Sequence, residues 1–550
     1  MIPARSRPAA SLALLAVAGC ALTGQPGGGD LDATPPRLDT LGSSPNFVTD
    51  ARPEALTLAF DEYVQLKNPT RDIVLTPTPR EGRPRFVARG REVRVDLSGV
   101  VYRDSTTYQL QFGTALQDLN EGNPAANLKY VFSTGPYLDS LELRGTVRDA
   151  EEGAPAIAAL VGLYRSLSDT ALVRSAPDYF TRTDSSGRFA LDYLSAGTYQ
   201  LASYLDENAN YRLAQGAEQV AFLDTTVTVA PGLPDTAYAL TLSLERPPLI
   251  AMRADQAFPG LLRVVLNQPA DDPRTALYDA PGTALATYAA GDTLFRAYAP
   301  PLDSLGEVVV GLLGETDTAR VRDPERGGPP PVRAVGRALA VAGEATLAQA
   351  FNLPLRGVDA SRVRVASTDS VAYPPGTWAV DTLDPRRLRW DAPTDTVSTL
   401  RVTWLPGALT TVFDSTNRDT LTADYNPRRA SEFGEIALTI AGLDTGRAYA
   451  LELLRDGTAL ERRVRLAPRQ DRVTLARVAG GNYAVRIVED LDGDGRYTPG
   501  SRRLRLQPER GGKFPLQEVR PDWIVEEEIN AEPIFAPFGV PGAAALELLD

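Results

Sequence analysis

The sequence predicts an all-β protein made of several β-sandwich domains. Apolar and polar residues alternate over short runs such as ALTLAF (55–60), EVRVDL (92–97) and TYQLQF (107–112), which is the strand signature. Glycine, proline, asparagine and aspartate bound these runs, which recur at roughly ten-residue spacing, as β-sandwiches require. A chain of 550 residues is long enough for several such domains. The strongest helix candidate, RALAVAGEATLAQAF (337–351), is equally compatible with a strand and a loop.

The composition limits the chemistry that the chain can perform. A formal net charge of −13 makes nucleic acid and anionic membrane surfaces poor partners. The absence of histidine excludes histidine-dependent catalytic triads, histidine general bases and histidine metal ligands. A single cysteine excludes an intrachain disulfide and a cysteine-rich metal site. We therefore expect a protein that is not an enzyme.

The N-terminus predicts export and lipidation. In MIPARSRPAASLALLAVAGC, arginines precede an apolar run (11–18) that is too short to span a bilayer, as in a secretory signal. VAGC (17–20) resembles a bacterial lipobox, which implies cleavage before Cys20, acylation of that cysteine with chains such as palmitate, and an anchor in the cell envelope. We expect the outer membrane as the site of the anchor. An ordinary signal peptide followed by a chance cysteine is the alternative, and the Gly/Pro-rich residues that follow predict a flexible tether.

The first folded module carries motifs of a known family. These motifs are TPP (34–36), FDEYVQLKNP (60–69), TYQLQFGTALQDLNEGNP (107–124) and YVFSTG (130–135). The module resembles the bacterial Ig-like domain of envelope lipoproteins of the Bacteroidetes type. That resemblance implies a small β-sandwich and does not imply an activity.

The next module resembles a different sandwich, and that sandwich occurs twice. LRGTVRD (143–149) and the long run from Thr183 to Gly216 are similar to the prealbumin-like regulatory domain of carboxypeptidases. Shifted by 284 residues, AGTYQLASYLDENANYRLAQG (196–216) lies on GGNYAVRIVEDLDGDGRYTPG (480–500) without a gap. This repeat predicts a second prealbumin-like sandwich near the C-terminus.

The Ig-like module shows a looser repeat. YQLQFGTALQDLNEGN (108–123) is similar in pattern to LRVTWLPGALTTVFDSTN (400–417), which predicts a second Ig-like sandwich. The expected segments are 1–19 (signal peptide), 20–36 (lipidated cysteine and tether), 37–136 (Ig-like), 139–245 (prealbumin-like), 246–332 (additional β domain with a Pro/Gly linker), 333–432 (second Ig-like), 433–525 (second prealbumin-like) and 526–550 (C-terminal tail).

EDLDGDGRYTPG (489–500) contains the richest cluster of candidate metal ligands. Asp490, Asp492 and Asp494 occupy positions 1, 3 and 5 of a calcium loop, and Gly495 occupies position 6. Position 12, which needs a bidentate glutamate in an EF-hand, is Ser501, and the preceding residues predict a strand instead of a helix. An EF-hand is therefore not expected, while a looser Ca²⁺ site stays open as the one candidate cofactor site.

The repeat supplies a weaker version of the same loop. Asp206, Asn208 and Asn210 fall on the three aspartates with less charge, so weaker calcium binding or none is expected there. In both loops the alternative is structural, because Asp and Asn side chains accept hydrogen bonds from the backbone two residues on and stabilise turns.

Other candidate sites have a stronger structural interpretation. Asp61 and Glu62 are adjacent, and neighbours on a strand point to opposite faces, so they are not expected to flank one glycosidic bond. The acidic run 526–528 predicts a solvated surface. The four tryptophans, three of them within 378–404, suggest either core packing or an aromatic platform for sugar.

These observations predict a non-catalytic lipoprotein of the cell envelope that acts as a structural or interaction module. The alternative is a surface protein, similar to an adhesin, that binds glycan or protein with the assistance of calcium. The expected partners are the membrane, through the lipid anchor, and an envelope protein or glycan, with no nucleic acid.

Overall fold

The structure is a computed structural model. It describes residues 32–535 except 126–127, 233–235, 271–274, 279–281, 303, 324–326, 341–345, 368–370, 392–398, 427–429 and 468. Cys20 and most of the predicted tether lie outside the described residues, as does the tail from residue 536 on.

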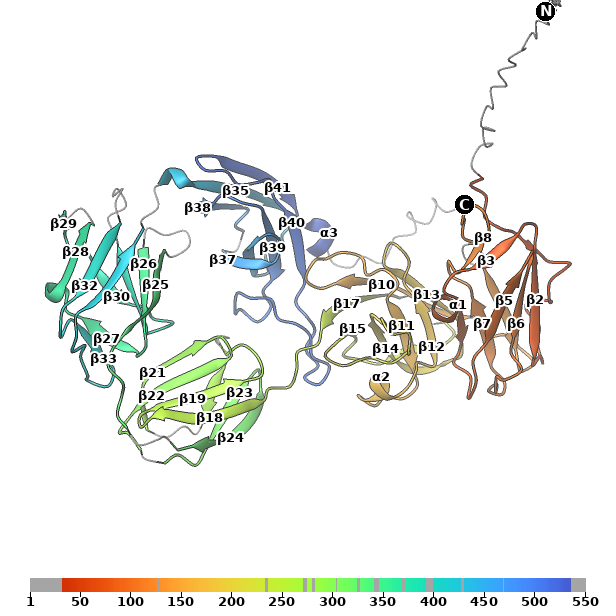
Figure 1. The fold of residues 1–550 in the computed structure, drawn as a ribbon. Coiled ribbons are helices and arrows are strands. Elements are labelled where there is room, and N and C mark those ends of the chain that lie inside the picture. The colour runs from red at the N-terminus through yellow and green to blue at the C-terminus, as the bar shows by residue number, and fades with distance from the viewer. Residues whose placement is uncertain are drawn as a thin grey trace, which may run out of the picture. The chain divides into compact units, whose positions relative to one another are not determined.

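The described chain is all-β, as predicted, with strands β1 to β41 and only short helices (Figure 1). It divides into two compact units. The first comprises the chain up to Leu75 together with Pro79–Tyr137, and the second comprises Thr76–Thr78 and the chain from Leu138 on. We number five modules by their sheets: module 1 contains β1–β9, module 2 β10–β17, module 3 β18–β24, module 4 β25–β34 and module 5 β35–β41.

Module 1 is a sandwich of three small sheets. Their strand orders are β1-β2-β6-β5, β4-β7-β9 and β3-β8. Alternation places Leu56, Leu58 and Phe60 of β2 in the core, where they pack with the inward residues of β6 and β7. The elements are β1 (Leu38–Asp39), β2 (Ala55–Phe60), β3 (Val64–Leu66), α1 (Pro69–Asp72), β4 (Val74–Thr76), β5 (Arg85–Arg89), β6 (Glu92–Asp96), β7 (Thr107–Gln111), β8 (Leu116–Asp118) and β9 (Lys129–Ser133).

Module 2 is built on one long sheet with the order β12-β11-β14-β15-β17-β10-β13, and β16 pairs with β14. Strands β10 and β17 run parallel, whereas the other pairs are antiparallel. The elements are β10 (Leu141–Asp149), β11 (Leu160–Tyr164), α2 (Ala171–Arg174), β12 (Tyr179–Arg182), β13 (Arg188–Leu194), β14 (Gly197–Tyr204), β15 (Gln219–Phe222), β16 (Val227–Val229) and β17 (Ala237–Leu244).

Module 3 is a sheet with the order β20-β23-β24-β18-β19-β22-β21 around its own core. Its strands are β18 (Ala251–Phe258), β19 (Leu261–Leu266), β20 (Ala276–Tyr278), β21 (Thr283–Ala290), β22 (Thr293–Ala299), β23 (Glu307–Leu312) and β24 (Glu315–Arg322).

Module 4 repeats the topology of module 1. Its sheets are β25-β26-β31-β30, β27-β33 and β29-β28-β32-β34, so each sheet of module 1 has a counterpart and β29 is an addition. The 337–351 segment forms strand in its described part, which decides between the two interpretations left open above. The elements are β25 (Ala334–Ala340), β26 (Thr346–Phe351), β27 (Leu355–Val358), η1 (Ala360–Arg362), β28 (Val363–Ser367), β29 (Ala372–Tyr373), β30 (Trp378–Val380), β31 (Arg387–Asp391), β32 (Leu400–Trp404), β33 (Leu409–Thr411) and β34 (Leu421–Tyr425).

Module 5 repeats the topology of module 2. Sheets β38-β35-β41 and β37-β36-β39-β40 follow the same neighbour order, and β35 and β41 are parallel as β10 and β17 are. Strand β41 runs to Asn530, because residues 526–530 pair with β35. The prediction that the module ends at residue 525 and that a tail begins at residue 526 is therefore wrong for residues 526–530. The elements are η2 (Ala430–Glu432), β35 (Phe433–Ala441), β36 (Tyr449–Arg455), β37 (Ala459–Leu466), β38 (Arg472–Ala479), β39 (Tyr483–Glu489), β40 (Gly511–Pro515), β41 (Ile524–Asn530) and α3 (Glu532–Phe535).

Modules 2 and 5 also share a hydrogen bond at equivalent tyrosines. The Tyr199 hydroxyl donates to the Ser195 carbonyl at 2.9 Å, and the Tyr483 hydroxyl donates to the Ala479 carbonyl at 3.0 Å. Both tyrosines are buried and lie 284 residues apart. The repeat therefore extends from the strand order to individual side-chain contacts.

Tyr199→Phe and Tyr483→Phe are each expected to lower the free energy of unfolding by about 1 kcal/mol, because each leaves a carbonyl without its hydroxyl donor. Thermal unfolding of both variants measures the loss. Tyr278→Phe is the control, since Tyr278 is half exposed and the change should cost less than about 0.5 kcal/mol. A loss confined to one of the two modules would contradict the equivalence.

Candidate metal centre

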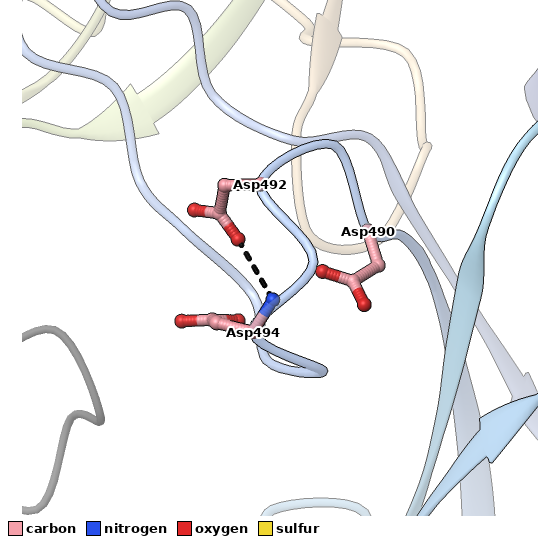
Figure 2. A group of neighbouring side chains, drawn as sticks. All are labelled: Asp490, Asp492 and Asp494. Carbon is pink, nitrogen blue, oxygen red and sulfur yellow. Dashed lines mark hydrogen bonds between the residues drawn. The ribbon is translucent and has the colours of Figure 1, made fainter.

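The aspartate-rich turn begins where β39, a strand of module 5, leaves its sheet. Asp490 is buried with 6% exposure, Asp492 is exposed and Asp494 is half-buried. One carboxylate oxygen from each lies within 4.8 Å of the others. Figure 2 shows the three carboxyl groups on one tight turn, with that of Asp490 directed into it. The structure thus brings the three predicted ligands together.

Backbone amides satisfy several of the carboxylate oxygens. Asp492 Oδ1 accepts from the amide of Asp494 at 3.2 Å (Figure 2), and Asp494 Oδ1 accepts from the amide of Arg496 at 2.7 Å. Asp490 Oδ2 accepts from the amide of Gly495 at 3.0 Å. The turn therefore does make the self-bonded contacts of the structural interpretation.

Asp490 is the buried member of the cluster. Asp490 Oδ1 is buried and has no hydrogen-bond partner among the described residues. Asp490 also forms no ion pair with any arginine or lysine in this described part of the chain. A buried carboxylate oxygen without a partner costs free energy, since ionised groups are normally paired when they leave water.

The backbone geometry of the turn explains why position 495 is a glycine. Its φ of +74° lies in the left-handed region, and a Cβ atom there would lie 2.6 Å from Nε of Arg465. Arg465 uses this close approach to donate from Nη2 to the Gly493 carbonyl at 2.5 Å. The turn and the neighbouring strand β37 are thus held together.

Glu509 is part of this site and is not among the residues predicted from the sequence. Its side chain is buried, and it accepts from the amides of Leu491 at 2.7 Å and Thr498 at 2.9 Å. Burial, together with the negative charge of Asp492, raises the pKa of Glu509 to about 8. Glu509 thus braces the backbone of the turn from across the loop.

The twin loop in module 2 has the same brace. The Glu218 side chain is buried and accepts from the amides of Glu207 at 3.3 Å and Ala214 at 2.9 Å, which are the positions equivalent to Leu491 and Thr498. Glu509 lies 291 residues after Glu218 instead of 284, so seven residues are inserted in module 5. A gapped alignment of the two repeats, with strands β15 and β40 matched, is the sequence signal that could have found Glu509.

The two loops differ in how the buried aspartate is neutralised. Asp206 Oδ2 is paired with Nη2 of Arg182 at 3.2 Å, and Asp206 Oδ1 accepts from the amide of Asn210 at 3.0 Å. Both oxygens of Asp206 are therefore occupied. In module 5, strand pairing places Arg465 at the position of Arg182, but it donates to Gly493 as described above.

The inserted residues of module 5 contact module 2. A hairpin closed by two backbone hydrogen bonds between Ser501 and Leu506 forms there. Gly500 donates its amide to Ser243 Oγ at 3.1 Å, and the backbone and guanidinium of Arg502 both donate to the carboxylate of Glu245. The segment leaving the aspartate turn thus joins the two copies of the repeat.

Further contacts surround this junction. They are Gln507 Nε2 to the Asp224 carboxylate at 2.7 Å, the Gly511 amide to the Ala150 carbonyl at 2.5 Å, Arg486 to Glu151, and Arg503 to Glu315 of module 3. Modules 3 and 4 are joined separately, by the edge-to-face contact of Phe258 with Phe413 at 5.1 Å.

Most of the tryptophans lie in the core of module 4. Trp390 and Trp404 are fully buried, and Trp378 stacks on Trp390 with ring centroids 5.1 Å apart. Trp523 is the exposed one, with Arg520 over its ring. Three of the four thus pack as core residues.

The remaining carboxylates have ordinary surroundings. Asp61 and Glu62 lie in a bend after β2, so the strand-alternation argument does not apply to them, and Asp61 accepts from the Arg37 amide at 2.8 Å. Residues 526–528 lie on β41 with their side chains exposed or half exposed. None of the helices in the described ranges is long and apolar enough to cross a bilayer.

Comparison with known proteins identifies one domain. The bacterial Ig-like domain family matches residues 32–134, which is module 1. No curated protein matches this sequence.

Solved structures with similar elements share little sequence and superpose poorly. One is the Bacillus anthracis TIE protein, with 8% identity over 90% of this chain and 74% of that chain and a TM-score of 0.13. A second is a structure that addresses Dscam isoform specificity, with 10% identity over 71% of this chain and 100% of that chain and a TM-score of 0.19. A third is the surface layer protein SbsC, domains 1–6, with 11% identity over 90% of this chain and 55% of that chain and a TM-score of 0.13. These TM-scores are too low to carry an argument about function.

Proposed function

We propose that this protein is a non-catalytic structural or interaction module of the bacterial cell envelope. The observation that carries the proposal is the junction between the two copies of the repeat. The inserted hairpin of module 5 is committed to holding module 2, with a buried ion pair at its centre. Contacts that hold neighbouring sandwich domains together are what a spacer or scaffold protein requires. The bacterial Ig-like domain at the N-terminal end also supports this role.

The proposed location is the outer membrane, with Cys20 as the lipid attachment site and residues 21–36 as the tether. Several acyl chains on one residue anchor a protein stably, whereas one chain gives only marginal binding. The proposed partners are the membrane itself and an envelope protein or glycan.

A Cys20→Ser variant tests this location. The wild-type chain is expected in the membrane fraction of the producing bacterium, labelled by a palmitate analogue, whereas Cys20→Ser is expected to lose the label and leave that fraction. Module folding, followed by thermal unfolding of both proteins, serves as the control. Equal partitioning of the two proteins would overturn the lipid anchor.

A second candidate function is calcium-assisted binding of a glycan or protein at the cell surface. The aspartate turn favours the calcium part of this alternative. The burial of Trp390 and Trp404 removes the aromatic platform that the tryptophan cluster suggested for sugar. The tryptophan cluster therefore gives no support to a glycan as the ligand of this alternative.

A further inference from the structure

We propose that the turn formed by Asp490, Asp492 and Asp494 binds one Ca²⁺ ion, and that the ion orders the segment that joins module 5 to module 2. The proposed site does not depend on the lipid anchor, and only the affinity range given below rests on the proposed export of the protein. The Ca²⁺ ion is thus the proposed ligand that controls the order of the junction between modules 5 and 2.

The unpartnered oxygen of Asp490 points to a cation. Asp490 is more than nine-tenths buried. Among the described residues, its Oδ1 atom accepts no hydrogen bond and its carboxylate forms no ion pair. One carboxylate oxygen each of Asp492 and Asp494 lies within 4.8 Å of a carboxylate oxygen of Asp490. A cation shared by these groups satisfies the buried oxygen and offsets the repulsion between like charges.

In the twin loop, an arginine supplies the positive charge beside the buried aspartate. Both loops start with a buried aspartate and are braced by a buried glutamate, Glu218 or Glu509. In module 2 the guanidinium of Arg182 supplies the positive charge to Asp206, and asparagines replace the other two aspartates. In module 5 the arginine at the equivalent position, Arg465, donates to the Gly493 carbonyl and does not supply a positive charge to Asp490.

Calcium suits this donor set better than magnesium. The donors are carboxylate oxygens on an irregular turn at positions 1, 3 and 5, which Ca²⁺ accepts in flexible geometry. Magnesium demands near-octahedral geometry and keeps several waters. Extracellular calcium modules bind with dissociation constants of about 10⁻⁴–10⁻³ M, which is the range to search.

The turn is connected to the junction through Thr498. Its hydroxyl donates to Asp492 Oδ2 at 2.9 Å and its amide donates to Glu509 Oε2 at 2.9 Å. Two residues later, Gly500 donates to Ser243 and accepts from the amide of Arg246 at 3.0 Å. An ion that fixes Asp492 therefore fixes the backbone that contacts module 2.

Calorimetric titration of CaCl₂ into the full chain, purified in detergent and stripped with EDTA, tests the site. One ion is expected to bind per chain, with a higher unfolding temperature on calcium addition and at least tenfold weaker binding of MgCl₂. Asp490→Asn and the surface variant Asp492→Asn are each expected to weaken calcium binding at least tenfold. Asp206→Asn, the matched change in the twin loop, is expected to leave it unchanged.

Absence of calcium binding to the wild-type chain would overturn the site, as would equal affinity of wild type and Asp492→Asn. Because Asp492 is exposed, its substitution is not expected to prevent folding, which an unchanged unfolding temperature in EDTA verifies. Tighter binding of magnesium than of calcium would overturn the choice of ion.

Hydrogen–deuterium exchange tests the second part of the proposal. Calcium is expected to slow exchange at least threefold in peptides covering 490–511 and in peptides covering 243–246 of module 2. In the Asp490→Asn variant, calcium addition is expected to leave the exchange rates of both sets of peptides unchanged. Protection confined to residues 490–498 would show that the ion orders the turn without controlling the junction.

Discussion

Replacing Trp404 with alanine is expected to destabilise module 4 by about 3–5 kcal/mol. The Trp404 side chain is 0% exposed and lies on β32, one of the strands that face the core. It makes edge-to-face contacts with Phe351 at 5.5 Å and with Trp378 at 5.9 Å, and both partners come from the opposite sheet. Truncation removes the side chain that joins the two layers and leaves a cavity that the sandwich cannot fill.

Exchange of the β28 and β32 amides, together with calorimetric unfolding, measures this loss within the full chain. Trp523→Ala is the matched control, because Trp523 is 63% exposed and its removal is expected to cost less than about 1 kcal/mol. If Trp404 belonged to a surface for sugar instead of the core, Trp404→Ala would leave both readouts near the wild-type values. That result would restore the aromatic platform as a candidate binding site.

The fold class could be predicted from the sequence because alternation is a local property. Runs such as ALTLAF (55–60) put every second side chain on one face, and β2 buries Leu56, Leu58 and Phe60 in that way. The pairing of strands is not local. The parallel pair β35 and β41 joins residues about ninety positions apart, and for that reason the prediction of a tail at residues 526–530 is wrong.

The candidate site was predictable only in part, for a similar reason. The three aspartates are close in sequence and the structure brings them together. Glu509 is separated from them by the inserted hairpin, and position 12 of a calcium loop that starts at Asp490 is Ser501 instead. The neutralisation of Asp206 by Arg182 depends on a neighbouring strand, and no spacing rule within the loop reveals it.

The inserted hairpin gives the two copies of the repeat different roles. Without the seven extra residues, the loop of module 2 ends directly at its brace, Glu218. With them, module 5 reaches Ser243 and Glu245 of module 2 while its own brace, Glu509, keeps its place. The seven additional residues thus make the strand-exit loop of module 5 a connector to module 2.

Replacing Arg502 with alanine is expected to weaken this connector by about 3–5 kcal/mol. The side chains of Arg502 and Glu245 are 9% and 5% exposed, and the guanidinium donates to Glu245 Oε2 at 3.2 Å. Removing the arginine leaves a carboxylate buried without its charged partner, which costs more than the pair contributes. Arg401→Ala is the control, because its pair with Asp424 is half exposed and is expected to contribute about 0–1 kcal/mol.

A double-mutant cycle separates the ion pair from general damage to the hairpin. Glu245→Ala and Arg502→Ala should each accelerate hydrogen exchange in residues 498–511, and the double variant should be less destabilised than the sum of the two, because neither charge is then left alone. Strictly additive losses would mean that the two side chains act independently. In that case the junction would rest on its backbone contacts at Gly500 and Gly511, and the side-chain pair at its centre would be dispensable.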